Sequence, residues 1–233
     1  MRFIMLKNFI IFLTAVLSSC ISSKGNISMN ASSQYWDQKW QTTVKEFKPN
    51  SFAMEAMRRT FSNGDVKELA LLDLGCGDGK DSFFFAEHGA KVLAIDVSHR
   101  ALQAIKARNL SIMVEQQNLE QLALPHDAFD IIYAHLSLHY FTTEKTIDII
   151  EKLRLALKNR GSLFIKVKST NDWQFGQGKK LADDIFEDGH LRHFFTVKKM
   201  ESLLQGFSKR EVFETKDYYE NHPHAFIEAI ATK

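Results

Sequence analysis

Three glycines stand at alternate positions in the stretch LLDLGCGDGKDSFF: Gly75, Gly77 and Gly79. One carboxylate precedes them at Asp73, and a second, Asp78, lies between the last two glycines. Glycine lets a backbone approach a ligand where a side chain would collide. The two carboxylates would repel a pyrophosphate and instead suit a ligand that carries positive charge. The loop therefore predicts a binding site for something other than a plain phosphate.

The elements around this loop are typical of a nucleotide-binding fold. An apolar strand pattern at 69–74 precedes it and a helical pattern at 80–88 follows it, which is the first unit of a doubly wound sheet. Asp96 ends the next predicted strand, nineteen positions after Gly77. That is close to the offset of roughly 20 residues at which an acid meets ribose hydroxyls in such folds. The spacing is G-x-G-x-G, however, and not the dinucleotide fingerprint G-x-G-x-x-G.

Strand and helix patterns alternate through the middle of the chain, which predicts a parallel sheet covered on both faces. Ser98 is expected to cap one of the helices, and Thr142 or Thr143 another. We expect Gly161 to end that second helix. The later strands of this part are predicted at 91–95, 111–115, 129–134 and 163–168.

The pattern changes after residue 169. It predicts a short helix at 179–187 and a second helix at 196–204 that Thr196 caps. Two closing strands are predicted at 209–215 and 225–232, with a polar turn region between them. Because no helix separates these two strands, we expect them to pair antiparallel.

At this point the sequence resembles the class I S-adenosylmethionine-dependent methyltransferases. DLGCGDG, from Asp73 to Gly79, is similar to the first motif of that family, and Asp96 matches its ribose-binding acid. FDIIYAHLSLHYF resembles the fourth-strand motif, and LKNRGSLFIKV the helix, turn and fifth strand that follow. The resemblance covers about Tyr35 to Lys233. It implies an α/β fold with a doubly wound, mostly parallel sheet of seven strands and an antiparallel last strand.

The resemblance also implies S-adenosyl-L-methionine as the cofactor and a set of residues that contact it. Early in the chain, YWDQKW resembles an N-terminal helix that folds over the cofactor in many small-molecule methyltransferases; the alternative is a helix that only packs on the fold. The implied cofactor-binding residues are Asp73, Gly75, Cys76, Gly77, Asp96, Val97, Asn118, Leu119, His135, Tyr35 and Trp36.

The histidines after the fourth predicted strand are candidates for the chemistry. Methyl transfer uses a reactive group on the cofactor, so alignment matters more than a dedicated catalytic residue. His139 is nevertheless a candidate general base for an acidic acceptor proton. His135 and His139, four apart, could instead be metal ligands on one helix face or ordinary packed histidines; with no third ligand nearby, no metal is expected. His190 and His193 are candidates to line the acceptor pocket, or belong to a surface turn.

The composition and charge of the chain limit which class of methyl acceptor is expected. The 233 residues are 45% hydrophobic, which fits one domain with a sizeable core. Beyond residue 28 the chain has 27 basic and 28 acidic residues, a balance of −1, which argues against a dedicated nucleic-acid binder. The fourth predicted strand is not followed by the [DN]-P-P-[YF] motif of many enzymes that methylate base amino groups. A small-molecule acceptor is expected. The alternatives are a nicotinamide-dependent oxidoreductase on a related fold and a non-catalytic S-adenosylmethionine-binding module.

The N-terminal segment MRFIMLKNFIIFLTAVLSSC has the basic start, apolar run and small residues of a secretory signal. Its end resembles a bacterial lipoprotein lipobox, in which Cys20 would carry the lipid; the alternative is that translation begins at Met29. Residues 21–33 predict a linker, and 34–233 the methyltransferase domain. Because S-adenosylmethionine is made inside cells, we expect a cytoplasmic domain. A membrane-anchored lipoprotein through Cys20 is the alternative.

Overall fold

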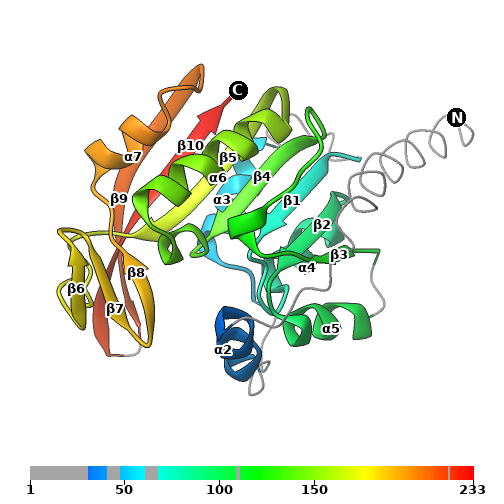
Figure 1. The fold of residues 1–233 in the computed structure, drawn as a ribbon. Coiled ribbons are helices and arrows are strands. Elements are labelled where there is room, and N and C mark those ends of the chain that lie inside the picture. Colours follow the sequence, from blue (N-terminus) through cyan, green and yellow to red (C-terminus); the bar gives the residue numbers. More distant parts are fainter. Residues whose placement is uncertain (1–30, 41–47, 61–67, 109–110, 220) are drawn as a thin grey trace, which may run out of the picture.

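The computed structural model describes residues 31–40, 48–60, 68–108, 111–219 and 221–233 (Figure 1). The predicted signal at 1–20 lies outside the described residues, as does most of the predicted linker. Residues 31–33 of that linker form the first turn of helix α2 (Ala31–Lys39). Within the described ranges, no helix is both long enough and apolar enough to cross a membrane.

A seven-stranded sheet forms the centre of the molecule, with strand order β3-β2-β1-β4-β5-β10-β9. β10 runs antiparallel to both of its neighbours and the other neighbouring pairs are parallel, which confirms the predicted doubly wound sheet with an antiparallel last strand. The strands are β1 (Ala70–Leu74), β2 (Lys91–Asp96), β3 (Met113–Gln116), β4 (Phe129–His135), β5 (Leu157–Lys168), β9 (Lys209–Tyr219) and β10 (His222–Thr232).

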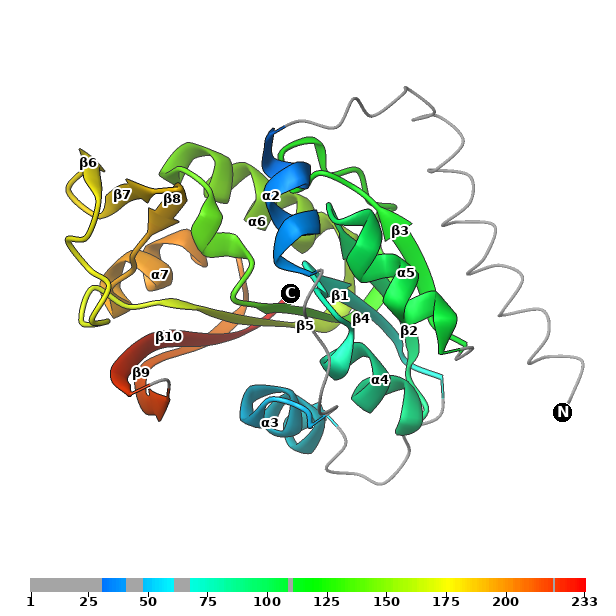
Figure 2. The same cartoon turned by 90° about the horizontal axis from the view of Figure 1, so that it is seen from below.

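Helices cover both faces of this sheet (Figure 2). Successive residues of a strand point to opposite faces, and Leu71 accordingly joins one apolar core while Leu72 joins the other. The core around Leu71 packs against α3 (Ser51–Thr60), α4 (Lys80–Glu87) and α5 (His99–Ala107). The core around Leu72 packs against α6 (Thr143–Ala156) and α7 (Val197–Leu203).

The predicted helix caps are confirmed. The Ser98 side chain accepts from the backbone N–H of Ala101 at the start of α5. Thr142 caps α6 in the same way, and Thr196 caps α7. Each such cap typically contributes about 1 kcal/mol to helix stability.

The predicted helix at 179–187 is wrong. The segment forms β6 (Lys179–Ala182) and β7 (Ile185–Asp188), which pair with β8 (His190–His193) in a separate antiparallel sheet. Contacts with residues outside this segment favour strands over a helix. The Phe186 ring packs against those of Phe175 and Phe194, with centroids 5.3 and 6.0 Å away. The alternative of a surface turn for His190 and His193 is wrong for the same reason, since both lie in β8.

Two strand boundaries also differ from the prediction. β5 begins at Leu157, directly after α6, so Gly161 lies within the strand and does not end the helix. The β4–β5 pairing shifts from Phe129 opposite Leu157 to Ile131 opposite Ser162, and this irregularity absorbs the extra residues. β9 and β10 extend through most of the predicted polar turn region and pair with each other from end to end.

Candidate functional site

A cavity of about 320 Å³ opens where the parallel strands β1, β2 and β4 end. It lies at the position expected for ligands of open α/β sheets, outside the carboxyl ends of the strands. The structure brings most of the predicted cofactor-binding residues together in its lining. These are Trp36, Asp73, Gly75, Cys76, Gly77, Asp96, Val97, Asn118, Leu119 and His135.

The glycine loop turns sharply beneath this cavity. The backbone N–H groups of Gly75 and Cys76 both donate to the Ile95 carbonyl, at 2.8 and 3.0 Å, which ties the loop to the end of β2. Gly75 has φ 73°, a region that side chains disfavour. A Cβ there would lie 2.5 Å from the Cβ of Ser137. The loop thus needs glycine partly because Ser137 already occupies the space.

Two carboxylates lie behind the loop and are held differently. The Ser82 hydroxyl donates to buried Asp73 at 2.5 Å. Burial, with the neighbouring charge of Asp81 as the next cause, raises the pKa of Asp73 to about 8. Asp81 accepts from the backbone N–H and the side-chain amide of Asn50, at 2.8 and 2.6 Å, and from the Tyr133 hydroxyl at 3.0 Å. Within the described ranges, Asp73 therefore has fewer hydrogen-bond donors than Asp81, and its carboxyl group remains available to a cation.

Asp96 joins two loops through its carboxylate. One oxygen accepts from the backbone N–H of Gly77 at 2.9 Å and the other from that of Ser98 at 2.8 Å. Burial raises the pKa of Asp96, and these backbone donors oppose that rise. Each carboxylate oxygen can accept a second hydrogen bond. The geometry thus gives Asp96 a structural role and leaves it able to accept from a ligand.

The carboxylate of Asp37 holds helix α2 across the cavity. Asp37 accepts from the Ser98 hydroxyl at 2.6 Å and from the backbone N–H of Arg100 at 3.2 Å. Trp36 and Trp40 then reach the cavity lining. Tyr35 does not line the cavity; its ring lies 5.1 Å from that of Trp36.

His135 lines the cavity at the end of β4 with an uncharged ring. Asn50 approaches its Nδ1 at 3.3 Å, and the ring lies parallel to that of Tyr133, with centroids 6.0 Å apart. Burial, with Lys166 as the next cause, lowers the pKa of His135 to about 3. His135 therefore does not serve as a positive charge near neutral pH.

His139 lies in the 3-10 helix η2 (Leu138–Tyr140), and the structure places it outside the cavity lining. It does not share a helix face with His135, because Leu136, with φ 53°, turns the chain between them. Burial, with Lys168 as the next cause, lowers the pKa of His139 well below its usual value. Among the described residues, no group of three histidine, cysteine or acidic side chains is arranged to hold a metal ion.

Some lining residues were not predicted. Ser137 and Tyr140 follow the fourth strand, so their position in the motif FDIIYAHLSLHYF is a signal that could have identified them. Asn50 is different, because it precedes α3 and meets Asp81 only through the tertiary fold. Trp40 packs beside Gly77 and belongs to the quoted stretch YWDQKW.

Comparisons with known proteins identify methyltransferases as similar to this chain. Residues 71–161 match a family model described as a methyltransferase domain. A malonyl-[acyl-carrier protein] O-methyltransferase of Hamiltonella defensa is 22% identical over 140 residues, which is 60% of this chain and 53% of that protein. The chain spans about half the length of the curated relatives it matches.

Solved structures share the fold. The N-methyltransferase NodS of Bradyrhizobium japonicum, in complex with S-adenosyl-L-homocysteine, superposes with a TM-score of 0.64 at 16% identity, over 87% of this chain and 99% of that one. The 1,6-didemethyltoxoflavin-N1-methyltransferase of Burkholderia thailandensis gives 0.62 at 15% identity, over 95% and 88%.

Proposed function

Because the chain belongs to the class I S-adenosylmethionine-dependent methyltransferases, we propose that it transfers a methyl group from S-adenosyl-L-methionine to a small-molecule acceptor. The observation that carries this proposal is the cavity at the strand ends. There the acidic loop after β1 and the acid at the end of β2 face one space, closed over by α2.

The residues in the cavity fit the cofactor at both of its ends. Buried Asp73 lacks a cationic partner among its described hydrogen bonds and suits the positively charged methionine part. Asp96, Asn118 and Leu119 line the part that suits the nucleoside. The hydroxyl of Ser137 is buried beside the loop without a hydrogen-bond partner in the described part of the chain, so a bound polar group would satisfy it.

S-adenosylmethionine, when bound, supplies the electrophilic methyl group. The chain's own contribution is to fix two ligands in line and to exclude water. Trp36 on α2 and Trp40, directly after it, do the latter by covering the cavity. His139 remains a hypothesis as a general base: its uncharged ring can accept a proton, but an acceptor would have to reach beyond the cavity lining.

The cavity has the size of a small-molecule site, which suits the cofactor. A volume of about 320 Å³ lies near the lower end of the range of roughly 300–1,000 Å³ for small-molecule sites. Two of the similar proteins are named for malonyl-[acyl-carrier protein] and for 1,6-didemethyltoxoflavin. The named matches are methyltransferases, which favours methyl transfer over the nicotinamide-dependent alternative.

We place the working domain in the cytoplasm, where its methyl donor is made. The sequence feature that opposes this is Cys20 in the lipobox-like segment. Mass spectrometry of the native N-terminus tests the proposal: a chain that starts at Met29 supports it, and a lipidated Cys20 in a membrane fraction overturns it.

Calorimetric titration with S-adenosylhomocysteine and, separately, with NADH tests the cofactor. We expect saturable binding of the first and none of the second. If S-adenosylhomocysteine does not bind, the proposed function fails. An acceptor screen with isotopically labelled S-adenosylmethionine, read by mass spectrometry, then distinguishes an enzyme from a module that only binds the cofactor.

A further inference from the structure

Four rings from three separate segments meet beside the cavity. They are Tyr35 and Trp36 of α2, Tyr140 of η2 and His190 of β8; we refer to them as the ring cluster. The Tyr140 ring lies 4.7 Å from that of Trp36 and 5.2 Å from that of His190, and the Tyr35 ring lies 5.0 Å from that of His190. Trp36 and Tyr140 also line the cavity. Tyr35 and His190 lie behind these two rings, so the cluster forms a wall of the cavity on the side of the small sheet.

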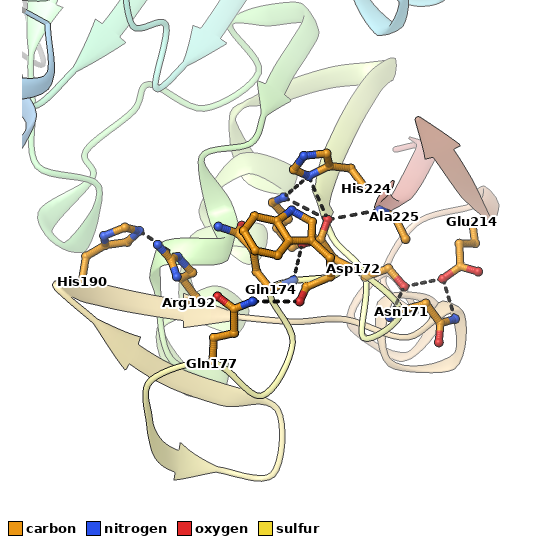
Figure 3. A network of polar contacts seen from close by, with 12 residues as sticks. Asn171, Asp172, Gln174, Gln177, His190, Arg192, Glu214, His224 and Ala225 are labelled. Carbon is orange, nitrogen blue, oxygen red and sulfur yellow. Dashed lines mark hydrogen bonds and ion pairs between the residues drawn. The ribbon is translucent and has the colours of Figure 1, made fainter. Parts of the chain in front are cut away.

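His190 brings an unused hydrogen-bond donor to this cluster. Arg192 donates to its Nε2 at 3.3 Å (Figure 3). Burial, with the Arg192 charge as the next cause, lowers the pKa of His190 to about 4, so the ring is neutral near pH 7. A neutral imidazole that accepts at Nε2 carries its proton on Nδ1. This Nδ1 is buried and has no hydrogen-bond partner in the described ranges.

Among the residues that the structure describes, the charges that act on His190 in the cluster are mainly positive. Lys39 places its ammonium 4.8 Å from the centre of the Trp36 ring. Both Lys39 and Arg192 act electrostatically on His190, and Asp188 opposes them. Asp188 is largely exposed and pairs with Arg192 at 3.1 Å. Such surroundings disfavour a cationic ligand and favour one that is neutral or negative.

We propose that the ring cluster is the acceptor site, and that it takes a flat aromatic molecule with an ionisable hydroxyl, of the phenol class. The inference rests on the proposed methyltransferase function and deepens it. Aromatic rings hold such a molecule by offset or edge contacts. The Nδ1–H of His190 donates to its oxygen, and the positive surroundings stabilise the phenolate.

Three probes of similar size test the proposal: 2-naphthol, decahydro-2-naphthol and 2-(aminomethyl)naphthalene. Binding of each is measured by calorimetry with S-adenosylhomocysteine present. We expect 2-naphthol to bind at least tenfold more tightly than the saturated alcohol and than the amine. Equal binding of the saturated alcohol would refute the aromatic site, and tighter binding of the amine would show a cation site in its place.

Variants locate the binding on the cluster. Trp36→Leu should weaken 2-naphthol binding about tenfold, and His190→Phe, which keeps a ring but removes the donor, several-fold. Tyr218→Leu is the control, because Tyr218 is 69% exposed on β9. Unchanged binding in both cluster variants would overturn the proposal. Separate titration with S-adenosylhomocysteine keeps the two claims distinct: if it binds and 2-naphthol does not, only the acceptor site fails.

Discussion

The two halves of the strand edge that surrounds the cavity have opposite electrostatics. Over β1 and β2, burial raises the pKa of the carboxyl groups of Asp73 and Asp96. On the other side, burial lowers the pKa of the imidazoles of His135 at the end of β4, His139 in η2 and His190 in β8 of the small sheet. The same desolvation thus favours the neutral form on both sides. The first half gains from a cation and the second from an anion, which is the polarity that a sulfonium donor and a phenolate acceptor would need.

The largest effect is expected when the acidic half loses Asp96. Asp96→Ala leaves two buried backbone N–H groups without their acceptor, which should lower the free energy of unfolding by about 1–3 kcal/mol. It should also weaken S-adenosylhomocysteine binding by roughly ten- to a hundredfold, since hydrogen bonds to a charged group are worth about 1.5–3 kcal/mol. Urea unfolding and calorimetry measure the two quantities.

A purely ribose-binding role, which the sequence resemblance implies for Asp96, would predict lost affinity with nearly unchanged stability for this variant. The hydrogen bonds to Gly77 and Ser98 change that expectation. Asp183→Ala is a suitable control, because the Asp183 side chain is fully exposed and does not line the cavity. If Asp96→Ala kept its affinity while losing stability, Asp96 would leave the proposed site and remain a structural residue.

Replacing Asp73 should raise the stability of the protein at high pH, whereas replacing Asp96 should lower it. Its folded pKa of about 8 lies above the value near 4 of an unfolded aspartate. Between these values the folded state binds the extra proton, so stability falls as pH rises from about 4 to about 8. Asp73→Asn removes this loss and keeps an oxygen that accepts from Ser82. We expect the variant to be more stable than the wild type at pH 8 and to bind S-adenosylhomocysteine about tenfold more weakly.

Unfolding curves at pH 5 and pH 8 test the first part, since the gain should appear only at the higher pH. Calorimetry in buffers of different ionisation enthalpy adds a second readout. The wild type should release a proton when the charged methionine part binds at pH 7, and Asp73→Asn should not. If Asp73→Asn lost stability at pH 8, Asp73 would be a structural group whose packing matters more than its ionisation.

The two halves also differ in how far the sequence predicted them. The acidic half comes almost entirely from one continuous segment, 70–98, so local spacing identified Asp73, Gly77 and Asp96. The other half is assembled from α2, η2 and β8, which are distant in the chain. Spacing cannot show that His190 meets Tyr140 when the strand that carries it pairs only in the folded molecule.

The same distinction explains which parts of the fold could be predicted from the sequence. The central parallel strands β1, β2 and β4 contain apolar runs, and the helix caps at Ser98, Thr142 and Thr196 are local signals. The segment 179–193 has neither. Its strands are four residues long and depend on antiparallel partners and on the Phe186 ring contacts, so its sequence was compatible with a helix until the tertiary contacts were known.

Removing α2 should have an intermediate effect on the affinity for S-adenosylhomocysteine. Without residues 29–40 the cavity loses Trp36 and Trp40, and we expect about tenfold weaker binding of S-adenosylhomocysteine with the central sheet still folded. Asp37→Ala, which removes the acceptor for Ser98 and Arg100, should give a smaller loss, about three- to tenfold. Calorimetry measures affinity and far-ultraviolet circular dichroism the fold. Full affinity in the truncated protein would mean that α2 only packs on the domain.

The smallest effect is expected at the junction of the small sheet with the main domain. The Lys199 ammonium donates to His193 Nε2 at 2.6 Å, to Asp184 at 2.6 Å and to the Thr143 hydroxyl at 2.9 Å, joining β8, α7 and α6. His193 in turn contacts the carbonyl of Phe141, in the cavity lining, through Nδ1 at 2.9 Å.

Lys199→Met should therefore lower the free energy of unfolding by only about 1 kcal/mol, because part of this cluster is exposed. It should raise the hydrogen exchange of β8 amides and weaken 2-naphthol binding while sparing S-adenosylhomocysteine binding. Lys198→Met, at the exposed neighbouring position, is the matched control. Equal losses for both ligands would show that the two halves of the strand edge are not separable.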